Sequence, residues 1–206
     1  EEFADREKLW NAVETAEKRK DAQLAREVEF AIPRELTKGQ GIELARELGM
    51  TQTRYYTANG LPDARQVTSA RDQAILARAI MRDFPQYYSY FGLHDWAYNG
   101  RNYRNTNGLL PTGRGYDGMK TGYTNASGYN LAASAVRDGR RLITVVLGGR
   151  STASRNAHVA ALMDVGFEVE RRRAGGERIQ VAQVIFEERG FGISADTAAP
   201  VQYASL

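Results

Sequence analysis

Residues 116–149 read YDGMKTGYTNASGYNLAASAVRDGRRLITVVLGG, and this part of the sequence carries the clearest pattern of strands and turns. Three runs within it, at 118–124, 129–136 and 141–148, are rich in β-branched, aromatic and small apolar residues, the composition typical of strands. Asp138-Gly139, between the second and third runs, is a strong signal for a tight hairpin turn. The stretch therefore predicts three consecutive antiparallel strands that form a meander.

Helical patterns lie on both sides of these strands in the sequence. Ser69-Ala70-Arg71-Asp72 has the form of a capping box, and apolar residues follow at helical spacing until Pro85. An alanine-rich helix is predicted at 151–172, where it would cover the sheet. Residues 86–115, rich in Tyr and Asn, have little periodicity and predict an ordered loop with an irregular hairpin. The predicted fold class is α+β, an antiparallel sheet packed by helices.

The first 47 residues differ in charge from the rest of the chain. They carry 9 Lys and Arg against 12 Asp and Glu, whereas the other 159 residues carry 19 against 13. A long helix is predicted from Arg6 to Phe30, and a second, short one from Thr37 to near Gly49. We therefore expect a helical segment at 1–47, a domain at 48–174, and a tail of unclear role at 175–206.

Composition excludes several kinds of protein. The chain of 206 residues has a net charge of +3 and no Cys, so disulfides, thiolate zinc sites and thiol nucleophiles are excluded. Its longest strongly apolar run, Leu142 to Leu147, is far shorter than the ~18 residues that span a bilayer. The acidic N-terminus lacks the pattern of a signal peptide, which predicts a cytoplasmic chain as it stands.

Metal and nucleic-acid sites are not predicted. His94 lies in a Tyr-rich loop and His158 on an alanine-rich helix face, so both are interpreted as structural or surface residues, with no metal and no cofactor expected. The run Glu17 to Asp21 mixes acids with bases and is interpreted as a solvated helix surface. Strong nucleic-acid binding is not expected from it.

Five ordered blocks between about 48 and 173 resemble the serine-type D-alanyl-D-alanine carboxypeptidases, penicillin-recognising enzymes that trim peptidoglycan. The blocks are Leu48–Thr53 leading to Ala58–Asp63, Thr68–Asp72, Asn105–Leu110, Gly118–Thr124, and Gly148-Gly149 before Arg155. The resemblance implies part of a β-lactamase/transpeptidase-like domain. It also implies a peptidoglycan stem peptide ending in D-Ala-D-Ala as partner.

The resemblance also implies roles for particular residues. Lys120, Thr121 and Gly122 match the family's strand motif, in which an ammonium and a hydroxyl hold the terminal carboxylate of a peptide lying along the strand. The backbone N–H of Tyr123 matches an oxyanion donor. Arg155 matches a second carboxylate contact on the following helix.

The family's nucleophile is missing from this sequence. It is a Ser three residues before a Lys, and none of the eight Ser residues has a Lys at that spacing. The family's Ser-x-Asn motif occurs only as Ser154-Arg155-Asn156, after the Lys120 strand, and is interpreted as coincidental. No catalytic residue is identifiable, so whether the chain is an enzyme stays open, and we expect it to be inactive alone with weak peptide binding.

Residues 1–47 resemble an internal piece of plasmid mobilisation relaxases of the MobA/MobL type. The resemblance rests on Leu9–Glu14, Glu17–Glu27 and Ala31–Leu36. Those relaxases cut DNA with a Tyr and a metal held by His, and this segment has neither residue. The alternatives to a carboxypeptidase-like protein are therefore a fragment of a mobilisation relaxase and a rearranged chimeric reading frame without function.

Overall fold

The computed structural model describes residues 38–56 and 63–188. The predicted helix at 6–30, residues 58–62 of the block Ala58–Asp63 and the end of the tail lie outside the described residues. The elements, in chain order, are α2 (Lys38–Glu47), α3 (Ala70–Asp83), the 3-10 helix η1 (Pro85–Gly92), β1 (Asp95–Tyr98), β2 (Arg101–Arg104), the 3-10 helix η2 (Leu110–Thr112), β3 (Tyr116–Thr124), β4 (Gly128–Arg137), β5 (Arg140–Gly149), α4 (Thr152–Ala174) and α5 (Val181–Glu188).

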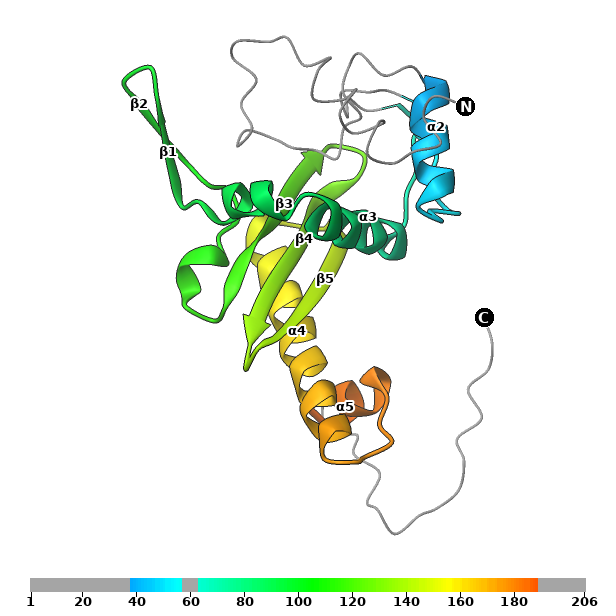
Figure 1. Cartoon of the computed structure of the whole chain (residues 1–206), viewed down its shortest axis with the longest axis vertical. Helices are drawn as coiled ribbons and strands as arrows, with labels where there is room; N and C mark the ends of the chain where they lie inside the picture. The colour runs from blue at the N-terminus through cyan, green and yellow to red at the C-terminus, as the bar shows by residue number, and fades with distance from the viewer. Residues whose placement is uncertain (1–37, 57–62, 189–206) are drawn as a thin grey trace. The chain divides into compact units, whose positions relative to one another are not determined.

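The predicted meander is confirmed. Strands β3, β4 and β5 form one antiparallel sheet in that order, so β4 is central (Figure 1). Asp138 and Gly139 connect β4 to β5 with φ angles of 50° and 74°, the left-handed region that a two-residue hairpin turn requires. The alanines of β4, with Leu131 and Ser134, are buried, which identifies the centre of the sheet as core.

The predicted helix beginning near Ser69 is also confirmed. The Ser69 hydroxyl accepts a hydrogen bond from the backbone N–H of Asp72 and caps the first turn of α3. Leu76 of α3 packs with Ala45, Met50 and Tyr55 in a buried apolar cluster that joins α2 to α3. Helix α3 crosses the front of the sheet near β5, and the first turns of α4 pass behind it (Figure 1). These elements confirm the α+β class.

Residues 86–115 are more regular than the sequence predicted. Pro85–Gly92 form η1, and β1 and β2 pair as a hairpin with Asn99 and Gly100 in the turn at φ angles of 48° and 70°. The predicted hairpin is therefore present, and only the expectation that it would be irregular is wrong. Asn-Gly is a hairpin signal as strong as Asp-Gly. The flanking residues are rich in aromatic side chains and have little periodicity, so regular strands were not predicted there.

An ion pair and hydrogen bonds connect η1 to the sheet. The Arg141 guanidinium of β5 forms an ion pair with Asp117 of β3 at 2.6 Å and donates to the hydroxyl of Ser134 on β4. The Tyr88 hydroxyl of η1 donates to the Asp117 carboxylate at 3.2 Å. Burial raises the pKa of Tyr88 to about 12, so this phenol stays a protonated donor at neutral pH.

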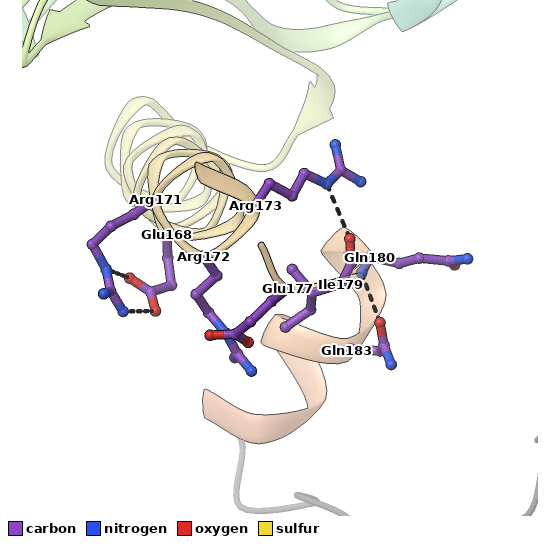
Figure 2. Close-up of polar contacts among 8 residues, drawn as sticks. All are labelled: Glu168, Arg171, Arg172, Arg173, Glu177, Ile179, Gln180 and Gln183. Atoms are coloured by element: carbon purple, nitrogen blue, oxygen red, sulfur yellow. Dashed lines mark hydrogen bonds and ion pairs between the residues drawn. The ribbon is translucent and has the colours of Figure 1, made fainter. Parts of the chain in front are cut away.

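The chain divides into two compact units between Ala161 and Leu162, within α4. In the second unit, the end of α4 and helix α5 form a helical pair around a core of Val165, Val169, Ile179 and Val184. Two arginines near the end of α4 bind the segment that leads to α5 (Figure 2): Arg172 donates to the Glu177 carboxylate at 2.6 Å, and Arg173 donates to the Ile179 carbonyl at 3.1 Å. Part of the predicted tail is therefore helical, and its Ile179 and Val184 share a small apolar core with α4.

The described residues contain neither a helix suited to a bilayer nor a side-chain cluster suited to a metal ion. None of their helices has the length and hydropathy needed to cross a bilayer. No three His, Cys, Asp or Glu side chains gather there in a way that could hold a metal ion.

Candidate functional site

The candidate site lies on β3, an edge strand of the three-stranded sheet. Lys120, Thr121 and Gly122 pair with Ala132, Leu131 and Asn130 of β4, respectively. Within the described ranges no strand pairs with the other edge of β3. Because an edge strand presents backbone N–H and C=O groups that no neighbour uses, an extended peptide can pair with β3 as an added strand.

A pocket of about 600 Å³ opens beside this strand. Residues from the sheet and from the segments around α3 line it: Lys120–Thr124 of β3, Leu131 and Ala132 of β4, Val145 and Leu147 of β5, Asp63, Val67 and Thr68 before α3, and Tyr55 and Gln73. The sheet supplies most of the apolar wall. The structure thus brings together four predicted site residues, Lys120, Thr121, Gly122 and Tyr123.

Thr121 has its side-chain hydroxyl fixed by a second hydroxyl. Thr121 Oγ1 lies 2.6 Å from Thr106 Oγ1, and Thr106 belongs to the segment between β2 and η2. The Lys120 ammonium donates to the backbone carbonyl of Thr121. Both Lys120 and Thr121 are 9% exposed, so their polar groups are held by protein more than by water.

Gly122 leaves open space beside the strand. A Cβ atom built at Gly122 would meet no other atom within 4 Å, although the residue lines the pocket. A ligand can therefore approach the backbone of β3 closely at this position.

The pocket's charges favour an anion. Lys120 is a cation in its wall, and Asp63 is the acidic residue among the residues that line it. The Arg65 guanidinium binds the Asp63 carboxylate at 2.6 and 2.8 Å, which offsets that negative charge. Burial raises the pKa of Tyr55 to about 12, so its phenol adds a neutral polar group to the wall.

A hydrogen-bond cluster at the start of α3 positions the wall opposite β3. The fully buried Asp72 carboxylate accepts bonds from the Gln52 N–H and the Thr53 hydroxyl, each at 2.8 Å. Gln73 donates to the Thr68 hydroxyl at 2.8 Å. The sequence marked Ser69–Asp72 as a helix start, but it contained no signal that Gln73 and Tyr55 would face the Lys120 strand.

Arg155 lies behind the strand rather than in the pocket. It is 3% exposed and is not among the residues that line the pocket. Its Nη1 donates to the backbone carbonyl of Asn130 at 3.2 Å, and its Nε and Nη2 donate to Asn156 Oδ1. Loss of hydration on burial lowers the pKa of Arg155. Its predicted contact with a carboxylate stays a prediction.

Tyr123 is half exposed and lies at the pocket mouth. Its ring packs against Tyr129 with centroids 4.4 Å apart, and its hydroxyl donates to Asn125 at 2.9 Å. The Tyr123 backbone belongs to the edge strand β3, which is where the oxyanion donor is expected. That role stays a prediction.

Family models match two overlapping parts of the chain. The model of D-alanyl-D-alanine carboxypeptidases matches residues 42–151, and that of the MobA/MobL family matches residues 1–58. The boundary predicted near residue 48 falls within the overlap. The conjugal transfer protein TraA of Agrobacterium fabrum is 58% identical over 41 residues, which are 20% of this chain and 4% of TraA.

Relatives of the carboxypeptidase part are longer proteins. D-alanyl-D-alanine carboxypeptidase DacA of Escherichia coli K12 is 41% identical over 121 residues, 58% of this chain and 30% of DacA. The chain thus spans about a third of the length of such a relative.

The fold agrees with that relationship. Penicillin binding protein 5 of Haemophilus influenzae superposes with a TM-score of 0.59 and 38% identity, over 62% of this chain and 38% of that protein. Both resemblances predicted from the sequence are confirmed, as is the partial transpeptidase-like fold. The chain belongs to the D-alanyl-D-alanine carboxypeptidase family.

Proposed function

We propose that this chain binds the terminal carboxylate of a peptidoglycan stem peptide ending in D-Ala-D-Ala, and does not hydrolyse it unaided. One observation carries the proposal: Lys120, Thr121 and Gly122 line one pocket on an unpaired edge of the described sheet. The peptide would pair with β3 as an added strand, with its carboxylate at the Lys120 ammonium and the Thr121 hydroxyl.

The lack of an activated nucleophile supports the second half of the proposal. Ser127 is the serine among the pocket's lining residues. Its hydroxyl accepts hydrogen bonds from the Thr124 hydroxyl at 2.8 Å and the Asn130 amide at 2.9 Å and donates to the Gly128 carbonyl at 3.4 Å, and none of these groups is a general base. A serine hydroxyl needs an adjacent general base to attack a carbonyl carbon. Ser127 therefore lacks the partner that hydrolysis requires.

Binding is proposed to be weak. The Lys120 ammonium already donates to the Thr121 carbonyl, so a carboxylate must compete with that bond, and ordering a flexible peptide costs free energy. The proposal also includes Arg155, which places a positive charge close to Asn130. It includes the Tyr123 N–H as a hydrogen-bond donor to the peptide carbonyl. Millimolar peptide concentrations are therefore needed to observe the complex.

An NMR titration tests the proposal. Acetyl-D-Ala-D-Ala should shift the amide signals of Lys120–Thr124, whereas the same peptide with a carboxamide end should shift them much less. Lys120→Ala should abolish the effect. If that variant unfolds, the carboxamide comparison on the unchanged chain still decides. Equal shifts with both peptides, or none at millimolar concentration, would reject a carboxylate site.

The match at residues 1–58 favours a second candidate function, a part in DNA mobilisation. The net negative charge of residues 1–47 weakens electrostatic attraction to phosphate, and the segment has no Tyr or His for a relaxase reaction. Mixing the chain with supercoiled plasmid and Mg²⁺ or Mn²⁺ should therefore leave the plasmid uncut. Site-specific nicking would favour this second function.

A further inference from the structure

Thr106 lies outside β3, and its side chain makes a hydrogen bond with Thr121 of the candidate carboxylate site. Its hydroxyl lies 2.6 Å from the Thr121 hydroxyl, although 15 positions separate the two residues in the sequence. Thr106 itself is exposed, whereas Thr121 is 9% exposed. The contact therefore joins an exposed residue to a buried one.

Two asparagines fix Thr106 in place. The Asn105 side chain donates to the backbone carbonyls of Leu93 at 2.8 Å and Phe91 at 3.3 Å. The buried Asn107 side chain donates to the Gly118 carbonyl of β3 at 3.1 Å, and its backbone N–H donates to Asn105 Oδ1. The Thr106 backbone is thus tied to β3 two residues before Lys120.

The direction of the hydrogen bond between Thr106 and Thr121 determines whether Thr121 can donate to a ligand. A threonine hydroxyl has one hydrogen to donate and lone pairs to accept with, whereas an ionised carboxylate can only accept. If Thr121 donated its hydrogen to Thr106, none would remain for a carboxylate. If Thr106 donates to Thr121, the Thr121 hydrogen is available to the ligand.

We propose that Thr106 is a positioning residue that donates to Thr121 Oγ1 and so directs the Thr121 hydrogen toward the carboxylate of the bound peptide. This inference rests on the proposed function and adds a determinant of selectivity for an anionic peptide end. Each bond of such a chain polarises the next, and a bond to a charged acceptor is stronger than one to a neutral acceptor. The gain is therefore larger for a carboxylate than for a carboxamide.

Three variants test the proposal. Thr106→Val removes the hydroxyl and keeps the shape of the side chain, and Thr106→Ser keeps the hydroxyl. Thr112→Val is the matched control, because Thr112 is also an exposed threonine, lies in the adjacent helix η2, and donates its hydroxyl to the Leu109 carbonyl rather than bonding Thr121. Circular dichroism and urea unfolding establish that each variant folds.

The first measurement needs no ligand. Three-bond couplings to the Thr121 methyl carbon report its χ1 rotamers in the free protein. The unchanged chain, Thr106→Ser and Thr112→Val should each show one rotamer, and Thr106→Val should show averaging between rotamers. A single Thr121 rotamer in Thr106→Val would overturn the positioning role, whether or not any peptide binds.

The second measurement is the ratio of affinities for acetyl-D-Ala-D-Ala and its carboxamide. Thr106→Val should lower this ratio about fivefold, the size of one net hydrogen bond, and Thr106→Ser should restore it. An unchanged ratio in Thr106→Val would overturn the selectivity. If the unchanged chain binds neither peptide, the proposed function and the selectivity fail together, and the rotamer result still decides the positioning role.

Discussion

Arg155 of α4 donates a hydrogen bond at 3.2 Å to the backbone carbonyl of Asn130, the β4 residue that pairs with Gly122. Helix α4 therefore contacts β4, the strand that pairs with β3, and supports the candidate site through β4. This contact separates two roles for Arg155, support of the sheet and direct binding of a carboxylate.

Arg155→Met should lower the free energy of unfolding by about 1–3 kcal/mol, because the Asn130 carbonyl and the Asn156 side chain lose buried charged donors. Urea unfolding measures this loss. Arg155→Lys keeps the charge without the planar fork and should recover only part of the stability. Full stability in Arg155→Met, with loss of peptide binding, would instead identify Arg155 as a direct contact.

Gly122→Ala should fold normally and bind peptide more weakly. The added methyl group meets no protein atom within 4 Å, yet it projects from a residue that lines the pocket. Thermal unfolding and the acetyl-D-Ala-D-Ala titration measure the two effects. Unchanged affinity would mean that the peptide does not approach β3 at this residue.

Gly149→Ala is the contrasting variant to Gly122→Ala, because the space around Gly149 is filled. A Cβ atom there would lie 2.9 Å from Arg155 Cβ and 3.0 Å from the Tyr129 carbonyl, so the start of α4 must move away from the sheet. The loss in unfolding free energy should be about 1–3 kcal/mol, as for other overpacked sites. A stability equal to that of Gly122→Ala would contradict the close approach of helix and strand.

Fluorescent penicillin should not acylate the isolated chain, and no D-Ala should be released from acetyl-D-Ala-D-Ala. The reason is that no serine has a lysine three residues on and that Ser127 lacks a basic partner. Intact mass spectrometry detects an adduct directly. A mass increase that disappears in Ser127→Ala would identify an unconventional nucleophile.

Stability should fall as the pH rises from about 10 to 12. Burial raises the pKa of Tyr55 to about 12, so between these values the unfolded chain loses a proton that the folded chain keeps. Below pH 10 both states are protonated and the effect vanishes. Tyr55→Phe should remove about 1–2 kcal/mol of this decrease, measured by urea unfolding at several pH values. An identical pH dependence in the variant would contradict the burial of the phenol.

Local signals in the sequence were sufficient for most elements of the fold. Ser69 caps α3 and Asp138-Gly139 turns the chain between β4 and β5 because capping and turn preferences depend on a few adjacent residues. Asn99-Gly100 carried the same kind of signal for the β1–β2 hairpin, and the aromatic composition around it obscured its meaning.

The candidate site was only partly predictable for the same reason. Lys120, Thr121 and Gly122 are consecutive, so one resemblance placed all three on one strand. Tyr55, Gln73 and Thr106 come from segments far from β3 in the sequence, and no spacing rule connects a loop residue to a strand residue that packs against it.

The meander, the capped helix, the family and the strand that carries Lys120 could all be predicted from the sequence, because periodicity, turn residues and motifs are properties of neighbouring positions. The contact of Thr106 with Thr121 and the bond from Arg155 to the Asn130 carbonyl could be found only in the folded chain. Those contacts depend on how segments 15 and 25 positions apart pack together, and packing is set by the shapes of buried surfaces in three dimensions.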